Sequence, residues 1–128
     1  MNEKGEIKCV KKMLGQFYTT RYDYILGGMK QPESNVTIVE PFVGEGHLLN
    51  FLVGDHKIEE YDLDVKREKS IRRDTLLSPP DYKNKFVLTN PPYLARNKSK
   101  DKTMFDFYEV NDLYKCFMKS LINDPPIG

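Results

Sequence analysis

The chain has 128 residues, 39% of them hydrophobic, which is enough for one domain with a modest core. Its 20 basic and 19 acidic residues nearly balance, which argues against a uniformly basic nucleic-acid coat but permits a local basic patch. Cys9 and Cys116 lack metal-ligand spacing, which favours reduced thiols in a cytoplasmic protein, with a disulfide as the alternative. The first residues are polar, and no apolar run approaches the roughly 20 residues of a bilayer span, so we expect no secretory signal and no membrane partner.

The first half of the chain predicts a helix, a buried strand and a second helix. Residues 1–14 form a polar lead-in, and the threonine pair in residues 15–20 is suited to cap a helix over 21–28. Residues 36–39 are β-branched and bounded by loop residues, which is typical of a buried strand. Residues 46–53 have the apolar spacing of a helix.

The second half predicts two further strands and one longer helix. Residues 57–64 indicate a strand that ends in carboxylates, and residues 86–89 indicate a third strand. The stretches 75–84, which contains two prolines, and 94–106, which is polar, are predicted loops. Apolar residues recur at helical spacing over 107–122.

Strands that alternate with helices predict an α/β fold, with a parallel Rossmann-like sheet and flanking helices in three layers. Ligands bind beyond the carboxyl ends of the strands in such sheets, so we expect Gly44, Asp62 and Asn90 to converge at one edge. Three strands leave an exposed sheet edge. We therefore expect residues 15–128 to be an incomplete domain, a fragment, or one part of a split or oligomeric protein.

Two glycines follow the first predicted strand and precede a predicted helix. Gly44 and Gly46 allow close approach of a ligand to the backbone, and the helix start offers free N–H groups. A tight turn without a ligand is the alternative. Asp62 ends the next strand, where an acid is suited to accept hydrogen bonds from ribose hydroxyls. Asp64 is a second candidate for this role. A solvated acid at the end of the strand, without a ligand, is the alternative.

Three further groups of polar residues bear on a site. Asp74, which follows two arginines, is suited either to accept from an adenine amino group or to pair with an arginine. Residues 96–102 carry four cations against one anion, which suits contact with phosphates or a solvated loop. His47 and His56 lack the spacing of metal ligands, so we expect no metal site.

The strongest local signal is the Asn-Pro-Pro-Tyr segment that follows the third predicted strand. An amine conjugated to an aromatic ring is a poor nucleophile, and the Asn90 side-chain oxygen and the Pro91 carbonyl can accept its hydrogens and orient its lone pair. Pro91 and Pro92 stiffen the segment, and Tyr93 offers a flat face for a base. A proline-rich turn without catalytic function is the alternative.

In their order along the chain, these segments resemble the S-adenosylmethionine-dependent adenine-N6 DNA methyltransferases, including those of restriction–modification systems. Residues 15–20 (GQFYTT) resemble the family's N-terminal cofactor motif, and residues 40–46 (EPFVGEG) resemble its glycine motif. Residues 90–93 (NPPY) match its catalytic motif in full, and Asp62 and Asp74 fall where its acidic motifs belong. The resemblance covers nearly the whole chain.

The resemblance implies a role for each matching residue. S-adenosyl-L-methionine would contact Phe17, Tyr18, Thr19, Glu40, Pro41, Phe42, Gly44, Gly46, Asp62, Asp74 and Asn90. Among these, Thr19 and Glu40 would meet its methionine end, Asp62 its ribose and Asp74 its adenine. The catalytic set would be Asn90, Pro91, Pro92 and Tyr93, holding an adenine flipped out of duplex DNA.

The same resemblance leaves two alternatives open. The family's enzymes continue with further strands and a target-recognition region, so it implies either a missing C-terminal region or a second subunit as partner. A protein-glutamine or RNA-amine methyltransferase would use the same catalytic segment, although residues 15–20 favour DNA adenine. The short length favours a non-catalytic fragment or subunit of a split methyltransferase.

Overall fold

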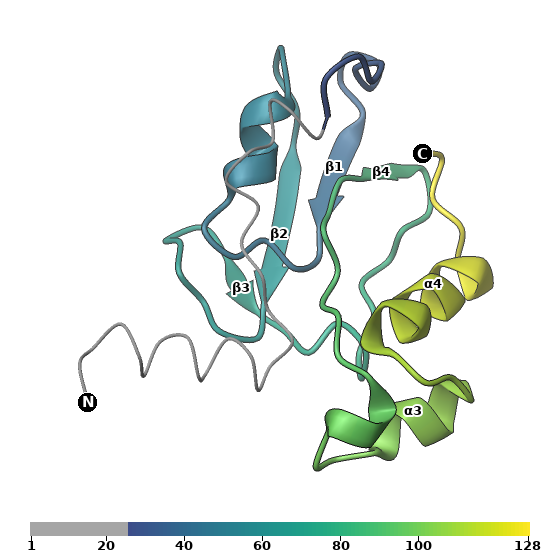
Figure 1. Cartoon of the computed structure of the whole chain (residues 1–128). Coiled ribbons are helices and arrows are strands. Elements are labelled where there is room, and N and C mark those ends of the chain that lie inside the picture. Colours follow the sequence, from purple (N-terminus) through teal and green to yellow (C-terminus); the bar gives the residue numbers. More distant parts are fainter. Residues whose placement is uncertain (1–25) are drawn as a thin grey trace.

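The computed structural model describes residues 26–128, which form a four-stranded parallel sheet in the order β3-β2-β1-β4 (Figure 1). The strands are β1 (Thr37–Glu40), β2 (Ile58–Asp62), β3 (Ile71–Arg72) and β4 (Lys85–Val87). The parallel α/β sheet is therefore confirmed, with three strands close to their predicted positions. The sequence does not predict β3, because two residues within a polar and mostly charged stretch carry no periodic signal.

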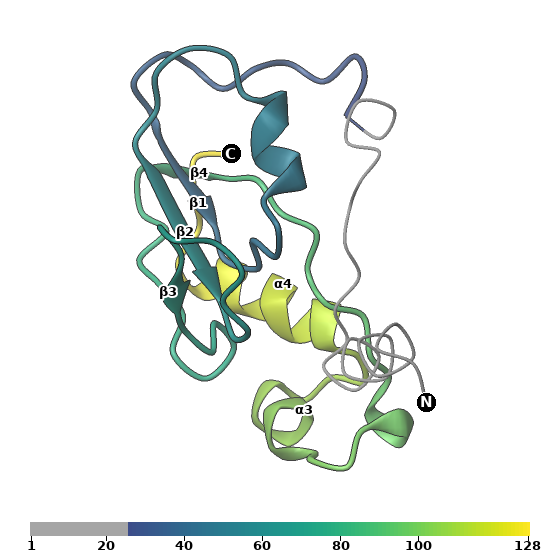
Figure 2. The same ribbon diagram turned by 90° about the vertical axis from the view of Figure 1, so that its left-hand side faces the viewer.

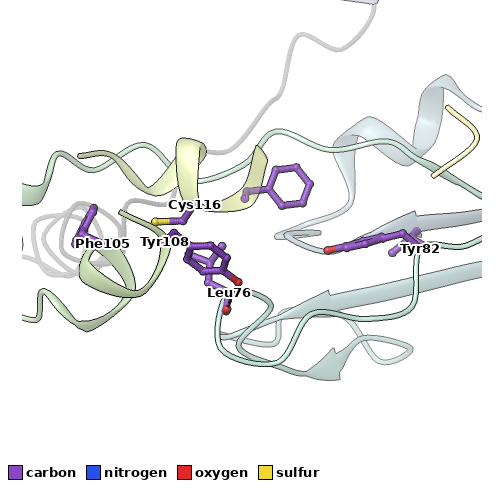
Figure 3. Packing of buried hydrophobic residues seen from close by; sticks show 7 residues of the cluster. Leu76, Tyr82, Phe105, Tyr108 and Cys116 are labelled. Carbon is purple, nitrogen blue, oxygen red and sulfur yellow. Dashed lines mark hydrogen bonds between the residues drawn. The ribbon is translucent and has the colours of Figure 1, made fainter. Parts of the chain in front are cut away.

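The two faces of the sheet bury two separate hydrophobic clusters. Ile38 and Val39 are both fully buried on β1, and successive side chains of a strand point to opposite faces. Ile38 packs with Leu26, Leu48 and Leu88 on one face. The cluster on the other face contains Val39, Leu76, Tyr82, Phe105, Tyr108, Cys116 and Phe117 (Figure 3).

Helical segments cover both faces of the sheet, which makes it the middle of three layers. The 3₁₀ helix η1 (His47–Phe51) contributes Leu48 to one cluster, and α4 (Leu113–Asn123) contributes Phe117 to the other. Figures 1 and 2 show the positions of the helices and strands in two views. The predicted α-helix over 46–53 is therefore wrong in type and too long. Gly46 precedes η1 with a φ of 81° and provides no side-chain cap, so only a short 3₁₀ segment forms.

The predicted helix over 107–122 is divided in two. The first helix, α3 (Thr103–Tyr108), ends because Glu109 takes a left-handed conformation with a φ of 57°. The second, α4, begins after Asp112, whose carboxylate accepts a hydrogen bond from the backbone N–H of Tyr114. The apolar stripe continues across both helices, and this continuity explains why the pattern predicts only one.

The predicted loops have different outcomes. Residues 75–84 contain no helix or strand, as predicted. Residues 94–106 contain the 3₁₀ helix η2 (Arg96–Lys98) and the start of α3, so the prediction of a continuous loop is wrong. The prediction was based on the polar composition of the segment. Contacts with the rest of the fold instead give the segment helical structure.

Several predictions lie outside the described residues. They are the polar lead-in, most of the helix over 21–28 and the cofactor residues Phe17, Tyr18 and Thr19. Within residues 26–128, none of the helices has the length and apolar character needed to cross a bilayer.

Candidate functional site

A cavity of about 210 Å³ lies at the carboxyl ends of the central strands. Gly44 follows β1, Asp62 ends β2, and Asn90 follows β4, and all three residues line the cavity together with Asp74 from the segment after β3. The predicted convergence of Gly44, Asp62 and Asn90 at one edge of the sheet is therefore confirmed. The carboxyl ends of parallel strands meet at one edge, which is the usual place for a ligand.

The cavity has a second wall that the sequence does not predict. It comes from the segment after the Asn-Pro-Pro-Tyr motif and from α3 and α4, and its residues are Leu94, Ser99, Asp101, Met104, Phe105 and Leu113. Phe105 and Tyr108 are both buried and three residues apart, a helical spacing that begins before the predicted helix. That short spacing is the sequence signal that could have revealed this wall.

Asp62 fixes the glycine segment with both of its carboxylate oxygens. One oxygen accepts a hydrogen bond from Gly44 N–H at 2.7 Å, and the other accepts from Asp64 N–H at 2.9 Å. The side chain is 4% exposed, so it is not a solvated strand-end acid. Asp64 instead forms a partly exposed ion pair with Lys66 at 2.8 Å. The acid at this edge therefore shapes the loop that borders the cavity.

Gly46 lies outside the cavity lining and has a structural partner. A Cβ atom at this position would overlap the guanidinium group of Arg67. Arg67 Nε in turn donates to the buried Glu60 carboxylate at 3.2 Å. The lack of a side chain at Gly46 thus allows Arg67 to pack against the loop, and a contact between Gly46 and a cofactor stays a prediction.

Glu40 is a buried acid at the carboxyl end of β1, outside the cavity lining. Burial raises its pKa from an ordinary value of 4.5 to about 8, and the carboxylates of Asp62 and Glu60 act in the same direction. The Thr89 side chain and the Phe42 N–H, which donates to Glu40 Oε1 at 3.1 Å, lower this pKa but only partly offset the effect of burial. Glu40 is therefore largely protonated near pH 7.

Hydrogen bonds join the segment after β3 to the rest of the site. Asp74 Oδ1 accepts from the N–H groups of Leu76 and Leu77, both at 3.2 Å, and so closes a turn beside the cavity. The Thr75 hydroxyl donates to the carbonyl of Pro41 at 2.9 Å. These contacts hold Asp74 beside the ends of β1 and β2.

The four residues of the Asn-Pro-Pro-Tyr segment are not equivalent. Asn90 and Pro92 line the cavity, whereas Pro91 and Tyr93 do not. Tyr93 is 46% exposed, and its ring lies 5.5 Å from that of Tyr114 with an interplanar angle of 42°. The tyrosine therefore has one ring neighbour on α4 and a large accessible surface.

Some of the basic side chains in residues 96–102 form local hydrogen bonds and ion pairs. Arg96 pairs with Asp106 at 2.8 Å, and Lys102 Nζ donates to the carbonyls of Arg96 and Ser99. Lys98 and Lys100 are exposed. Among residues 26–128, no group of three or more histidine, cysteine or acidic side chains could hold a metal ion.

Comparisons with known proteins provide no independent assignment of this site. The sequence matches no protein-family model and no curated protein sequence. The chemistry of the site therefore depends on the residues that surround the cavity.

Proposed function

We propose that this chain binds S-adenosylmethionine and transfers its methyl group to the N6 amine of an adenine flipped out of DNA. The observation that carries this proposal is that Gly44, Asp62, Asp74 and Asn90, from four separate segments, line one cavity. These are residues to which the sequence resemblance assigns the cofactor and the target amine.

The lining of the cavity suits the nucleoside part of the cofactor. Phe42 and Leu76 provide apolar surface for a base, while Asp62 and Asp74 provide acceptors for ribose hydroxyls and an amino group. The volume of about 210 Å³ is below the roughly 300–1,000 Å³ of typical small-molecule sites, which fits part of the cofactor. We assign the methionine ammonium group to Glu40, at the end of β1.

Asn90 and Pro91 would activate the target amine by orientation. Bound S-adenosylmethionine would supply an electrophilic methyl group, whose carbon–sulfur bond would break as the nitrogen attacks, leaving a neutral thioether. The Asn90 side-chain oxygen and the Pro91 carbonyl would accept the two hydrogens of the amine, which turns its lone pair out of conjugation with the ring. These hydrogens become more acidic as the nitrogen gains its new bond, so both acceptors bind the transition state more strongly than the ground state. One proton finally leaves the amine for water.

Tyr93 would hold the flipped base before the chemical step. Its ring is 46% exposed, so a base can reach its surface. Stacking on an aromatic ring contributes roughly 1–3 kcal/mol, which offsets part of the few kcal/mol that base flipping costs. The exposed Lys98 and Lys100 lie close in sequence and suit contacts with backbone phosphates.

The test is single-turnover transfer of a labelled methyl group to duplex DNA, RNA and a glutamine peptide. Asn90→Ala should lose about 10²–10³ in rate while cofactor binding measured by calorimetry survives. Asn97→Ala, on exposed η2, is the matched control and should keep normal turnover. Tyr93→Phe retains the stacking surface and should be much less harmful than Tyr93→Ala.

The outcomes of this experiment separate the competing assignments. Normal turnover in Asn90→Ala would reduce the segment to a structural turn and refute the mechanism. Transfer to RNA or to glutamine alone would replace the substrate. Cofactor binding without transfer to any acceptor, restored by a second chain or a C-terminal extension, would identify a subunit or fragment of a split enzyme.

A further inference from the structure

Asp112 joins the start of α4 to the segment that directly follows Tyr93. Its Oδ1 accepts hydrogen bonds from Leu94 N–H at 3.1 Å and from Tyr114 N–H at 3.3 Å. The Leu94 carbonyl accepts from Leu113 N–H at 3.1 Å, and an isolated antiparallel bridge pairs Ala95 with Asp112. Both backbone polar groups of Leu94 are therefore held by the first turn of α4.

The ring of Tyr114 provides a second contact between the same two segments. It lies 5.5 Å from the Tyr93 ring, while Lys115 Nζ lies 5.9 Å from the Tyr114 ring centroid. A ring pair of this kind adds to the attraction that comes from burying its area. Tyr93 is thus restrained through its ring and through the backbone of the next residue.

We infer that Asp112 and Tyr114 are positioning residues that set the orientation of Tyr93 and the adjoining wall of the cavity. Leu94 and Leu113 both line that cavity, so the hydrogen bond between their backbones also fixes its shape. The consequence for base stacking rests on the proposed methyltransferase function. The restraint on Tyr93 is independent of that function, because it follows from the contacts alone.

The restraint can be measured without any reaction. The sequence contains no tryptophan, so Tyr93→Trp introduces a single fluorescent indole as a reporter at the site. Amide hydrogen exchange at Leu94 reports its hydrogen bond to Asp112 directly. Asp112→Ala, made in the reporter background, should raise the exchange rate of this amide roughly fivefold or more and make the reporter indole more accessible to acrylamide.

Asp124→Ala is the matched control at the opposite end of α4. The Asp124 carboxylate accepts from Tyr82 N–H at 2.9 Å, which is also a loop amide held by an acid that flanks the helix. This variant should speed exchange at Tyr82 and leave both the Leu94 amide and the reporter indole unchanged. Asp112→Asn retains an acceptor oxygen and should restore most of the Leu94 protection.

Tyr114→Leu tests the ring contact separately and covers the case in which Asp112→Ala does not fold. It should free the reporter indole while the Leu94 amide stays protected. Unchanged quenching of the indole in Tyr114→Leu, and in Asp112→Ala where that variant folds, would overturn the inference, as would an equal increase in indole accessibility in Asp124→Ala. If the restraint is present but methyl transfer is undetectable, the proposed function fails and the positioning role stands.

Discussion

Glu40→Gln should change how the stability of the protein depends on pH. Glutamine has the shape of the protonated carboxyl group and keeps an oxygen that can accept from Phe42 N–H. It cannot ionise, so it removes the free-energy cost of protonating this group when the chain folds above its ordinary pKa. The wild-type group has a pKa of about 8 in the folded protein, compared with an ordinary value of 4.5.

The direction of the effect follows from counting protons in the two states. Between about pH 4.5 and pH 8, the unfolded chain has released this proton and the folded chain keeps it. The free energy of unfolding therefore falls as pH rises through this window. The resulting decrease in the free energy of unfolding reaches about 3 kcal/mol at pH 7, and roughly 2–3 kcal/mol of this decrease occurs between pH 5 and pH 7.

Urea unfolding of wild type and Glu40→Gln at several pH values measures this difference. The two proteins should have similar stability at pH 5, and the variant should be more stable by about 3 kcal/mol at pH 7. Glu33→Gln removes an exposed carboxylate and controls for the loss of a charge. Parallel curves for wild type and Glu40→Gln would refute the reasoning, because Glu40 would then be ionised in the folded state or paired with an unrecognised cation.

Three further results are expected. Asp62→Ala should lower the free energy of unfolding by about 1–3 kcal/mol, because the Gly44 amide loses its acceptor, and an unchanged urea midpoint would contradict this. Gly46→Ala should lower the free energy of unfolding by about 1–2 kcal/mol because of its φ of 81°, and further because a Cβ atom would displace Arg67. A double-mutant cycle with Arg67→Ala would show no coupling if the contact with Arg67 is unimportant. Under the proposed function, the affinity for S-adenosylmethionine should increase as pH rises from about 6 to 8, because the ammonium group of the cofactor favours ionised Glu40. Binding should then release up to one proton, which calorimetry in two buffers can count. A count of zero would show that Glu40 does not contact the methionine end.

The sequence predicts the sheet and the edge of the site because these depend on local pattern. Residues 36–39 are all β-branched and are bounded by loop residues, so their strand is evident without tertiary information. Asp62 and Asn90 follow from the same logic, since a residue at the end of a parallel strand must lie at the carboxyl edge. The convergence on one cavity therefore needed only the correct order of elements.

What the sequence could not predict depends on contacts between distant residues. The break between α3 and α4 is set by the left-handed Glu109 and by the cap from Asp112, which a continuous apolar stripe conceals. The overlap of Arg67 with the space beside Gly46 has no local pattern. The burial of Asp62 likewise emerges only when the loop folds back across the end of β2, so a strand-end acid and a loop anchor look identical in the sequence.

The double use of Asp62 restricts how this position can vary. Because one carboxylate receives the amides of both Gly44 and Asp64, any replacement must present two acceptors in a space made for a short side chain. Asparagine has only one such oxygen, and glutamate adds a methylene to a side chain that is 4% exposed. In a saturation library scored for soluble yield, we therefore expect depletion of every substitution at Asp62, even with no ligand present. Low tolerance to substitution at this position would therefore indicate its structural role in holding the loop. Only a separate selection for ligand binding could reveal a functional role as well.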